Sequence, residues 1–306
     1  MVTRSGFVSR LLVVANIGAL CLCAGAAERR NGPADSGPSR DAGLIRYDIP
    51  GGESIFALSL KGAAPQDKSA PHDHVVLFDT SASQAGGHRQ QGLAVVTALL
   101  ASLGSSDRVQ LFAADVQIKA LSNGFFAPQS AETKVALAEL KRRVPLGATS
   151  LQPALETALN AAADSSARDR ARSIIYIGDG MSTGKLVDRQ EFRSLISQLR
   201  TKRIPFSSFA VGPRTDLQVL GVLAHQTGGV VLVDALVDDA SLSAEKLGKK
   251  LATAADAVVL YPETISLAPQ ADKLAAALSP GDLPPIRSDR ETILLGKGRL
   301  GDLLKV

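Results

Sequence analysis

An acid and two hydroxyl side chains follow an apolar run of this chain. Asp79, Ser81 and Ser83 stand at alternate positions directly after the apolar run 75–78. Carboxylate and hydroxyl oxygens are ligands that hard divalent cations such as Mg²⁺ prefer. The run is typical of a buried strand, and ligands of an open α/β sheet gather outside the carboxyl ends of its strands. The sequence therefore predicts a metal site at the end of this strand.

Two later loops carry oxygen ligands of the same kind. Thr149 and Ser150 lie in a loop before a predicted helix, and Asp179 follows the apolar strand 173–177. Each has an ordinary alternative, because Thr149 or Ser150 would also cap the helix and Asp179 with Gly180 would also form a turn. The serines near 80 would also serve as hydroxyls at a helix start. The conjunction favours a metal site, since all three loops fall on one edge of a parallel sheet.

Strands and helices alternate from residue 74 onward and would position these side chains. We expect strands at 74–78, 108–113, 116–121, 173–177, 206–211 and 230–233, and helices at 88–103, 130–143, 151–163, 188–203, 216–226 and 240–254. This alternation predicts an α/β fold with a doubly wound, mostly parallel sheet and helices on both faces. Only a tight turn separates the second strand from the third, so that pair must be antiparallel and lie at an edge.

The order of elements and the oxygen-bearing positions together resemble the von Willebrand factor A (VWA) domain and its metal-ion-dependent adhesion site. The resemblance covers about 74–254 and implies a Rossmann-like VWA fold that binds Mg²⁺ or Mn²⁺. It implies that Ser81 and Ser83 ligate the metal through their hydroxyls and Thr149 directly or through water. Asp79 and Asp179 would hold coordinated waters. All five positions match the family pattern.

The resemblance implies a binding module and not an enzyme, with one coordination position left for an acidic group of a protein partner. The alternative is a haloacid-dehalogenase-like Mg²⁺-dependent phosphatase, which also begins from an Asp at a strand end. That family expects a second acid where this chain has Ser81, and another after Gly180, where the chain continues with 181–183, Met-Ser-Thr. A third possibility is a structural VWA domain with an idle metal site.

The sequence divides into four segments. Residues 1–27 read as a signal peptide with Arg4 and Arg10 before an apolar stretch, and this predicts a secreted, periplasmic or cell-surface protein. We interpret 28–73 as a linker with a short β-rich segment, 74–255 as the VWA domain and 256–306 as a β-rich tail. The tail looks unfinished, as in a fragment of a longer chain or a truncated product. This layout resembles that of inter-α-trypsin-inhibitor heavy-chain-like proteins and large bacterial surface proteins.

Composition narrows the classes of partner that we expect for this chain. The chain has 34 basic and 30 acidic residues, no Trp and three Tyr, so stacking on nucleic-acid bases is poorly supported and we expect no nucleic-acid partner. Its apolar stretch is short for a membrane span of about 20 residues, so we expect membrane contact only if the signal segment stays uncleaved. Both cysteines, Cys21 and Cys23, lie in that segment. A lipoprotein signal is the alternative there, and a mature chain would have neither disulfides nor thiolate ligands.

A second group of metal-ligating side chains, His72, Asp73 and His74, comes before the first strand instead of after it. The length of that strand separates these residues from Asp79 by roughly 16 Å. They therefore belong to the opposite edge of the sheet, and we interpret them as a solvated strand entrance. His88 follows two glycines near the predicted metal site, and we interpret it as surface at a helix start.

Overall fold

The computed structural model describes residues 42–49, 54–62, 70–164, 169–233, 243–262 and 283–298. The chain divides into an α/β unit, Ala64–Tyr261, and a flanking unit formed by Met1–Ala63 and Pro262–Val306. The predicted signal segment lies outside the described residues. Among the helices that the structure describes, none is both long and apolar enough to cross a membrane.

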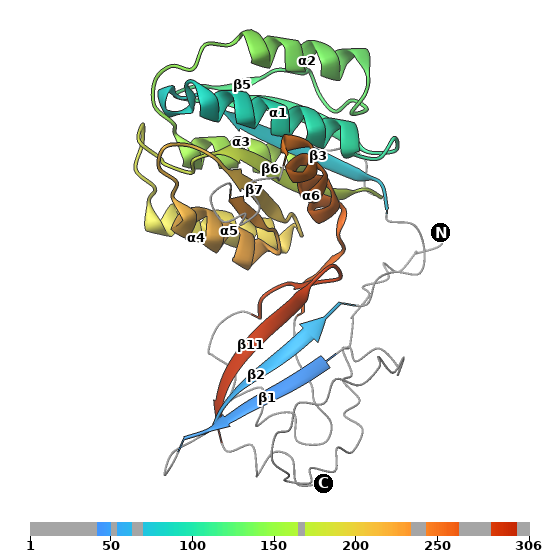
Figure 1. Ribbon diagram of the computed structural model, residues 1–306, viewed down its shortest axis with the longest axis vertical. Coiled ribbons are helices and arrows are strands. Elements are labelled where there is room, and N and C mark those ends of the chain that lie inside the picture. Colours follow the sequence, from blue (N-terminus) through green and yellow to red (C-terminus); the bar gives the residue numbers. More distant parts are fainter. Residues whose placement is uncertain are drawn as a thin grey trace, which may run out of the picture. The chain divides into compact units, whose positions relative to one another are not determined.

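A six-stranded sheet forms the centre of the α/β unit, in the order β5-β4-β3-β6-β7-β8 (Figure 1). Its strands are β3 (His72–Asp79), β4 (Arg108–Ala114), β5 (Ile118–Ala120), β6 (Ala171–Gly178), β7 (Phe206–Ala210) and β8 (Val231–Val233). All neighbours are parallel except β4 and β5, which pair antiparallel at one edge. The expected fold class and its antiparallel edge pair are confirmed.

Helices cover both faces of this sheet, as expected. They are α1 (Gly87–Ser102), α2 (Ala131–Arg142), α3 (Leu151–Ala163), α4 (Arg189–Thr201), α5 (Leu217–Thr227) and α6 (Ala244–Asp256), with a short 3₁₀ turn η1 (Ala82–Gln84). Side chains of a strand alternate between the two faces. In β3, Val76 and Phe78 pack in the core shared with α1, α2 and α6, whereas Val75 and Leu77 pack in the core shared with α3, α4 and α5.

Most element boundaries fall within a few residues of the expected ones. The strand expected at 116–121 is shorter, because β5 pairs with β4 only over Ile118–Ala120. Helix α6 begins later than expected, at Ala244. Ser243 is its N-cap residue, and the Ser243 side chain accepts the Lys246 N–H. Gly228, with φ of 84°, ends α5 in the left-handed conformation that glycine adopts readily.

The described part of the flanking unit contains a three-stranded antiparallel sheet of β1 (Ala42–Asp48), β2 (Ser54–Lys61) and β11 (Glu291–Gly298), in the order β1-β2-β11 (Figure 1). The short strand β10 (Ile286–Arg287) also belongs to this unit, whereas the short strand β9 (Val259–Leu260) lies at the end of the α/β unit. Leu58 of β2 pairs with Leu294 of β11, and both are buried. The N-terminal β-rich segment and the C-terminal tail therefore share one sheet, which their separate patterns did not reveal.

Candidate metal centre

The end of β3 places Asp79 inside the α/β unit. Asp79 pairs with Ala114 of β4, and the preceding Phe78 pairs with Ile177 of β6, so the carboxyl ends of three central strands lie level with one another. Alternation along β3 puts the Asp79 side chain on the same face as Val75 and Leu77, which is the face that α3 covers. The loop before α3, with Thr149, lies there, and Asp79 is fully buried.

Hydrogen bonds join the five predicted residues into one cluster. The Thr149 hydroxyl lies 3.0 Å from both carboxylate oxygens of Asp79, and the Ser81 N–H donates to Asp79 Oδ1 over 2.8 Å. Ser81 and Ser83 share a hydroxyl–hydroxyl hydrogen bond of 2.9 Å. Ser83 Oγ donates in turn to Asp179 Oδ2 over 2.5 Å. The structure thus brings together every residue that the sequence placed in the site, from three separate loops.

The two carboxylates of the cluster have no ion-pair partner among the basic side chains that the structure describes. Both are almost fully buried, and within the described residues neither forms an ion pair with Lys or Arg. Burial, and then the charge of Asp179, raise the pKa of Asp79 to about 6. Arg143 lies in the neighbouring network, but it donates to Asp115 Oδ2 over 2.7 Å instead.

Tyr176 supports the cluster from β6, and sequence reasoning missed it. Its hydroxyl donates to Asp79 Oδ2 over 2.8 Å and accepts the Gly180 N–H over 3.2 Å. The side chain is completely buried, and burial, followed by the Asp79 and Asp179 charges, raises its pKa well above 10. A signal was present in the sequence, because a Tyr among the isoleucines of an apolar strand needs a partner for its hydroxyl.

Glycine at position 178 allows β6 to approach β3 closely beneath the cluster. A Cβ at Gly178 would lie 2.4 Å from the Asp79 Cβ and 2.5 Å from the Tyr176 hydroxyl oxygen. Neither distance is compatible with a side chain unless Asp79 or Tyr176 moves. Gly178 is therefore part of the packing that fixes the Asp79 carboxylate.

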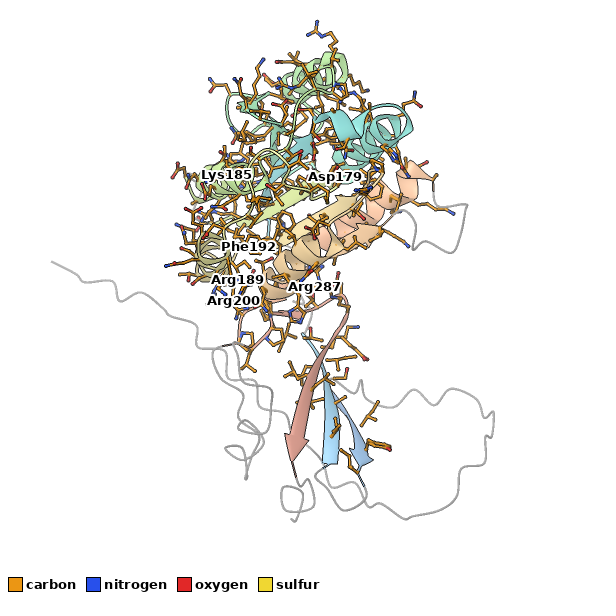
Figure 2. All side chains as sticks on the ribbon, turned by 90° about the vertical axis from the view of Figure 1, so that its left-hand side faces the viewer. Asp179, Lys185, Arg189, Phe192, Arg200 and Arg287 are labelled. Carbon is orange, nitrogen blue, oxygen red and sulfur yellow. The ribbon has the colours of Figure 1, made fainter. Side chains whose placement is uncertain are left out.

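Thr149 and Ser150 do not cap α3 with their side chains. Ser150 occupies the N-cap position without a side-chain capping hydrogen bond, and the Leu151 N–H donates to Ser182 Oγ over 3.1 Å instead. Ser182 lies in the loop 180–185, which begins after Asp179 and ends at Lys185, both labelled in Figure 2. Ser150 is therefore the N-cap residue, but neither hydroxyl caps the helix, and the Thr149 hydroxyl is directed to Asp79.

A second network holds the loop after β3. The Thr80 hydroxyl donates to Asp115 Oδ2 over 2.8 Å, and the Thr80 carbonyl accepts the Leu146 N–H over 3.0 Å. The Ala82 N–H donates to the carbonyl of Gly147 over 3.0 Å. These bonds tie the loop that contains Ser81 and Ser83 to the loop that precedes Thr149.

The donor set of the cluster fits a hard divalent cation. It offers hydroxyl and carboxylate oxygens and neither nitrogen nor sulfur, which is the ligand chemistry of Mg²⁺ and Mn²⁺. The two buried carboxylates would have their charge balanced by such an ion. Asp79, Ser81, Ser83, Thr149 and Asp179 are the residues that would hold it, directly or through water.

The histidines at the other end of β3 are not solvated, contrary to the sequence interpretation. His72 is 6% exposed and His74 fully buried, with the two rings stacked 5.4 Å apart. Burial, and then the neighbouring His74, lower the pKa of His72. Asp73 points to the opposite face, where it accepts hydrogen bonds from Arg108 and Arg170. Packing of α6 over this end of β3 covers the histidines.

The sequence matches the von Willebrand factor type A domain family over residues 73–232, and the chain belongs to this family. Domains of this family are generally protein-binding or adhesion modules and are usually non-catalytic. No curated protein sequence matches the chain.

Solved structures with similar folds include a von Willebrand factor type A protein from Catenulispora acidiphila. It has a TM-score of 0.56 and 12% identity, over 81% of this chain and 61% of that one. The ArnB paralog VWA2 from Sulfolobus acidocaldarius has a TM-score of 0.49 and 13% identity, over 85% and 67% of the two chains. Proximal thread matrix protein 1 from the mussel byssus has a TM-score of 0.47 and 16% identity, over 63% and 50%. The similarity to the Catenulispora protein supports the fold alone, and this chain spans 61% of its length.

Proposed function

We propose that this VWA domain binds Mg²⁺ or Mn²⁺ at the five-residue cluster and uses the ion to recognise an acidic group on a protein partner. The observation that carries the proposal is the pair of buried carboxylates, Asp79 and Asp179, which form one hydrogen-bonded cluster with three hydroxyl side chains and pair with no basic group among the described residues. An ion bound there would keep a position for a ligand from outside the chain.

The hydroxyl ligands matter for the proposed recognition. Ser81, Ser83 and Thr149 are neutral, so a bound cation would keep more of its positive charge than it would among carboxylates alone. A carboxylate of a partner would then be attracted to the remaining coordination position. Specificity for one partner would come from the loops around the site, at 82–91, 180–185 and 213–216.

We also propose that the chain acts outside the cytoplasm, as a secreted, periplasmic or cell-surface protein. The proposal rests on the basic, apolar and small-residue pattern of 1–27, which is typical of a secretory signal. Cell fractionation tests the location, and recovery of the protein from the cytoplasmic fraction alone would contradict the proposal. Amino-terminal sequencing of protein from culture medium or cell envelope would show whether residues 1–27 are removed.

Calorimetric titration of the chelator-treated full chain with Mg²⁺ and Mn²⁺ tests the metal site. We expect binding of one ion, lost in Ser81→Ala and in Asp79→Ala, because each change removes an oxygen from the cluster. Ser194→Ala, at an exposed position of α4, is the matched control and should bind as the unaltered protein does. Equal binding by all of these proteins would contradict the assignment.

Partner recognition needs a separate experiment. Immobilised protein should capture a partner from an extracellular protein fraction in Mg²⁺ but not in chelator, and Ser81→Ala should capture none in either condition. Capture that ignores chelator and survives Ser81→Ala would contradict a metal-centred contact.

Hydrolysis of an aryl phosphate serves as the counter-test for the phosphatase alternative. We expect no Mg²⁺-dependent turnover, since Ser81 stands where that chemistry requires a second acid. Metal-dependent turnover that disappears in Asp79→Asn would overturn the binding-module proposal.

A further inference from the structure

Four metal-ligating side chains converge at the amino-terminal edge of the sheet, at the other end of β3 from the five-residue cluster. They are His72, His74, Asp107 and Asp256, and all belong to the α/β unit. We propose that these four residues form a second cation site, suited to Zn²⁺ or a similar transition metal and independent of the first.

Three elements bring the four side chains together. His72 and His74 occupy alternate positions of β3, and with Val76 and Phe78 they share the face that α1 and α6 cover. Asp107 lies in the loop between α1 and β4, and Asp256 is the last residue of α6.

Close packing of α6 on α1 places Asp256 over the end of β3. A Cβ at Gly248 of α6 would lie 2.5 Å from the Ala98 Cβ and 2.6 Å from the Leu99 backbone nitrogen of α1. This approach is possible only for glycine, and it sets how near the end of α6 comes to the histidines.

The distances among these groups suit a shared ion better than direct hydrogen bonds. His74 Nε2 lies 3.5 Å from Asp256 Oδ1 and 4.0 Å from Asp107 Oδ2, and His72 Nδ1 lies 4.0 Å from Asp256 Oδ1. Protein hydrogen bonds are typically about 2.7–3.2 Å. Ligands about 2.1 Å from a tetrahedral metal lie about 3.4 Å from one another. The three separations exceed that spacing by about 0.1–0.6 Å. The two imidazole rings, stacked 5.4 Å apart, would have to turn toward each other for both to ligate one ion.

A buried ring nitrogen points into the middle of the group. His74 Nε2 is completely buried and makes no hydrogen bond in the structure, although it faces two carboxylates. The other nitrogen of the ring, Nδ1, lies 2.7 Å from the Ser173 hydroxyl. With the proton on Nδ1, the ring donates to Ser173 and leaves the Nε2 lone pair available to a metal, which is the usual arrangement of a histidine ligand.

The ligand types separate this site from the first one. Two imidazoles and two carboxylates suit Zn²⁺, whereas Mg²⁺ prefers oxygen ligands alone. The charge of the two carboxylates would balance that of one divalent ion. Asp107 is already held in place, because its two oxygens accept the backbone N–H groups of His72 and Gly104 over 2.8 Å each. Each oxygen retains a second lone pair for a metal.

A bound ion would tie α6 to the sheet. Both His72 and Asp256 lie outside residues 73–232, the segment that matches the VWA family. The proposed site thus includes a residue of α6, beyond the matched segment, and its occupancy would fix α6 against β3.

Titration of the chelator-treated full chain with Zn²⁺, and separately with Co²⁺, tests the site. Excess Mg²⁺ is present throughout so that the five-residue cluster is not available to the probe. We expect one equivalent of Zn²⁺ to bind and to raise the melting temperature, and Co²⁺ to give the visible absorption of a four-coordinate ion. Ser81→Ala should leave both signals unchanged, because it alters only the first site.

His74→Ala and Asp256→Asn should each weaken Zn²⁺ and Co²⁺ binding by at least about tenfold, and Ser173→Ala by about tenfold through the ring orientation. His225→Ala, at an exposed position of α5, is the matched control and should bind normally. Asp256→Asn keeps the test decisive if His74→Ala fails to fold, since Asp256 is 33% exposed at a helix end. Absence of Zn²⁺ binding, or binding that survives Asp256→Asn, would overturn the proposal.

Discussion

Single residues decide whether the carboxyl edge of the sheet can hold a cation. Asp79 is completely buried, accepts hydrogen bonds from Ser81, Thr149 and Tyr176, and shares the cluster with the second carboxylate, Asp179. Two buried like charges repel, so this arrangement lowers the stability of the fold when no metal is bound. A bound cation would offset the repulsion.

Asp79→Asn should therefore act in opposite directions with and without metal. In chelator at neutral pH, we expect the variant to unfold with a free energy about 1–3 kcal/mol larger than the unaltered protein, since one buried charge is gone. With saturating Mg²⁺, only the unaltered protein should gain stability. Thermal and urea unfolding in both conditions measure this, and an equal Mg²⁺-dependent gain in the variant would contradict it.

Tyr176→Phe should weaken the site without removing an expected ligand. The change leaves the buried Gly180 N–H without its acceptor and removes one of the two hydroxyl donors to Asp79 Oδ2, at a cost of about 1–3 kcal/mol in unfolding free energy. We expect Mg²⁺ affinity to fall about 10–100-fold, as for other groups that orient metal ligands. Tyr47→Phe, at an exposed position, should change neither quantity in the same calorimetric and unfolding measurements.

At the scale of elements, the approach of β6 to β3 determines where Asp79 lies. Strand β3 supplies the carboxylate, and β6 supplies the hydroxyl of Tyr176 that orients it. Gly178 of β6 faces Asp79 at this contact, where no side chain fits. The site is thus sensitive to a change that touches none of the five proposed metal-binding residues.

Gly178→Ala should lower the unfolding free energy by about 1–3 kcal/mol, because the added methyl group overpacks the strand interface. It should also weaken Mg²⁺ binding by displacing Asp79. Gly221→Ala in α5 is the matched control, since a Cβ there meets nothing within 4 Å. We expect it to raise the unfolding free energy by about 0.5–1 kcal/mol. Chemical unfolding of both variants would show equal effects if the strand contact were unimportant.

At the scale of the whole molecule, the hydrophobic cores of the sheet are built within one unit. Every residue of the two core clusters lies between Val75 and Ala255, inside the unit Ala64–Tyr261. The flanking sheet, by contrast, joins strands from both ends of the chain, because β11 pairs with β2. The α/β unit is therefore built from one continuous segment, whereas the flanking sheet needs strands from both ends of the chain.

A shortened chain of residues 64–261 should fold by itself. We expect one cooperative unfolding transition and a Mg²⁺ affinity within about twofold of the full chain, because the core residues and both sets of proposed ligands are retained. Circular dichroism melts and calorimetry measure these properties. A chain of this length that lacks a cooperative transition would show that the flanking segments are needed for the fold.

Much of the fold could be predicted from local pattern. Apolar runs at 75–78 and 173–177 indicated buried strands, and the turn between β4 and β5 allowed only an antiparallel pair. The five oxygen-bearing residues could be grouped as well, since the carboxyl ends of parallel strands share one edge. These predictions could be made because they depend only on residues close in sequence and on the alternation of side chains along a strand.

The capping alternative for Thr149 and Ser150 shows where local pattern was insufficient. Both residues stand where a helix cap is expected, yet the Leu151 N–H is satisfied by Ser182, from a loop that is distant in sequence. The hydroxyl that meets the amino-terminal end of α3 was therefore decided by the packing of the loop 180–185.

The sequence by itself determined the α/β class, the order of elements and the grouping of oxygen-bearing side chains at the carboxyl edge of the sheet, because strand periodicity and the shared edge of parallel strands settle these. Only the tertiary structure decided that Tyr176 supports Asp79, that β11 pairs with β2, and that His72 and His74 are buried beside Asp107 and Asp256. Alternation along a strand tells which face a side chain takes. The partner that it meets there depends on how a distant helix or strand packs, and the packing of α6 turned an expected solvated end of β3 into a buried group of metal-ligating side chains.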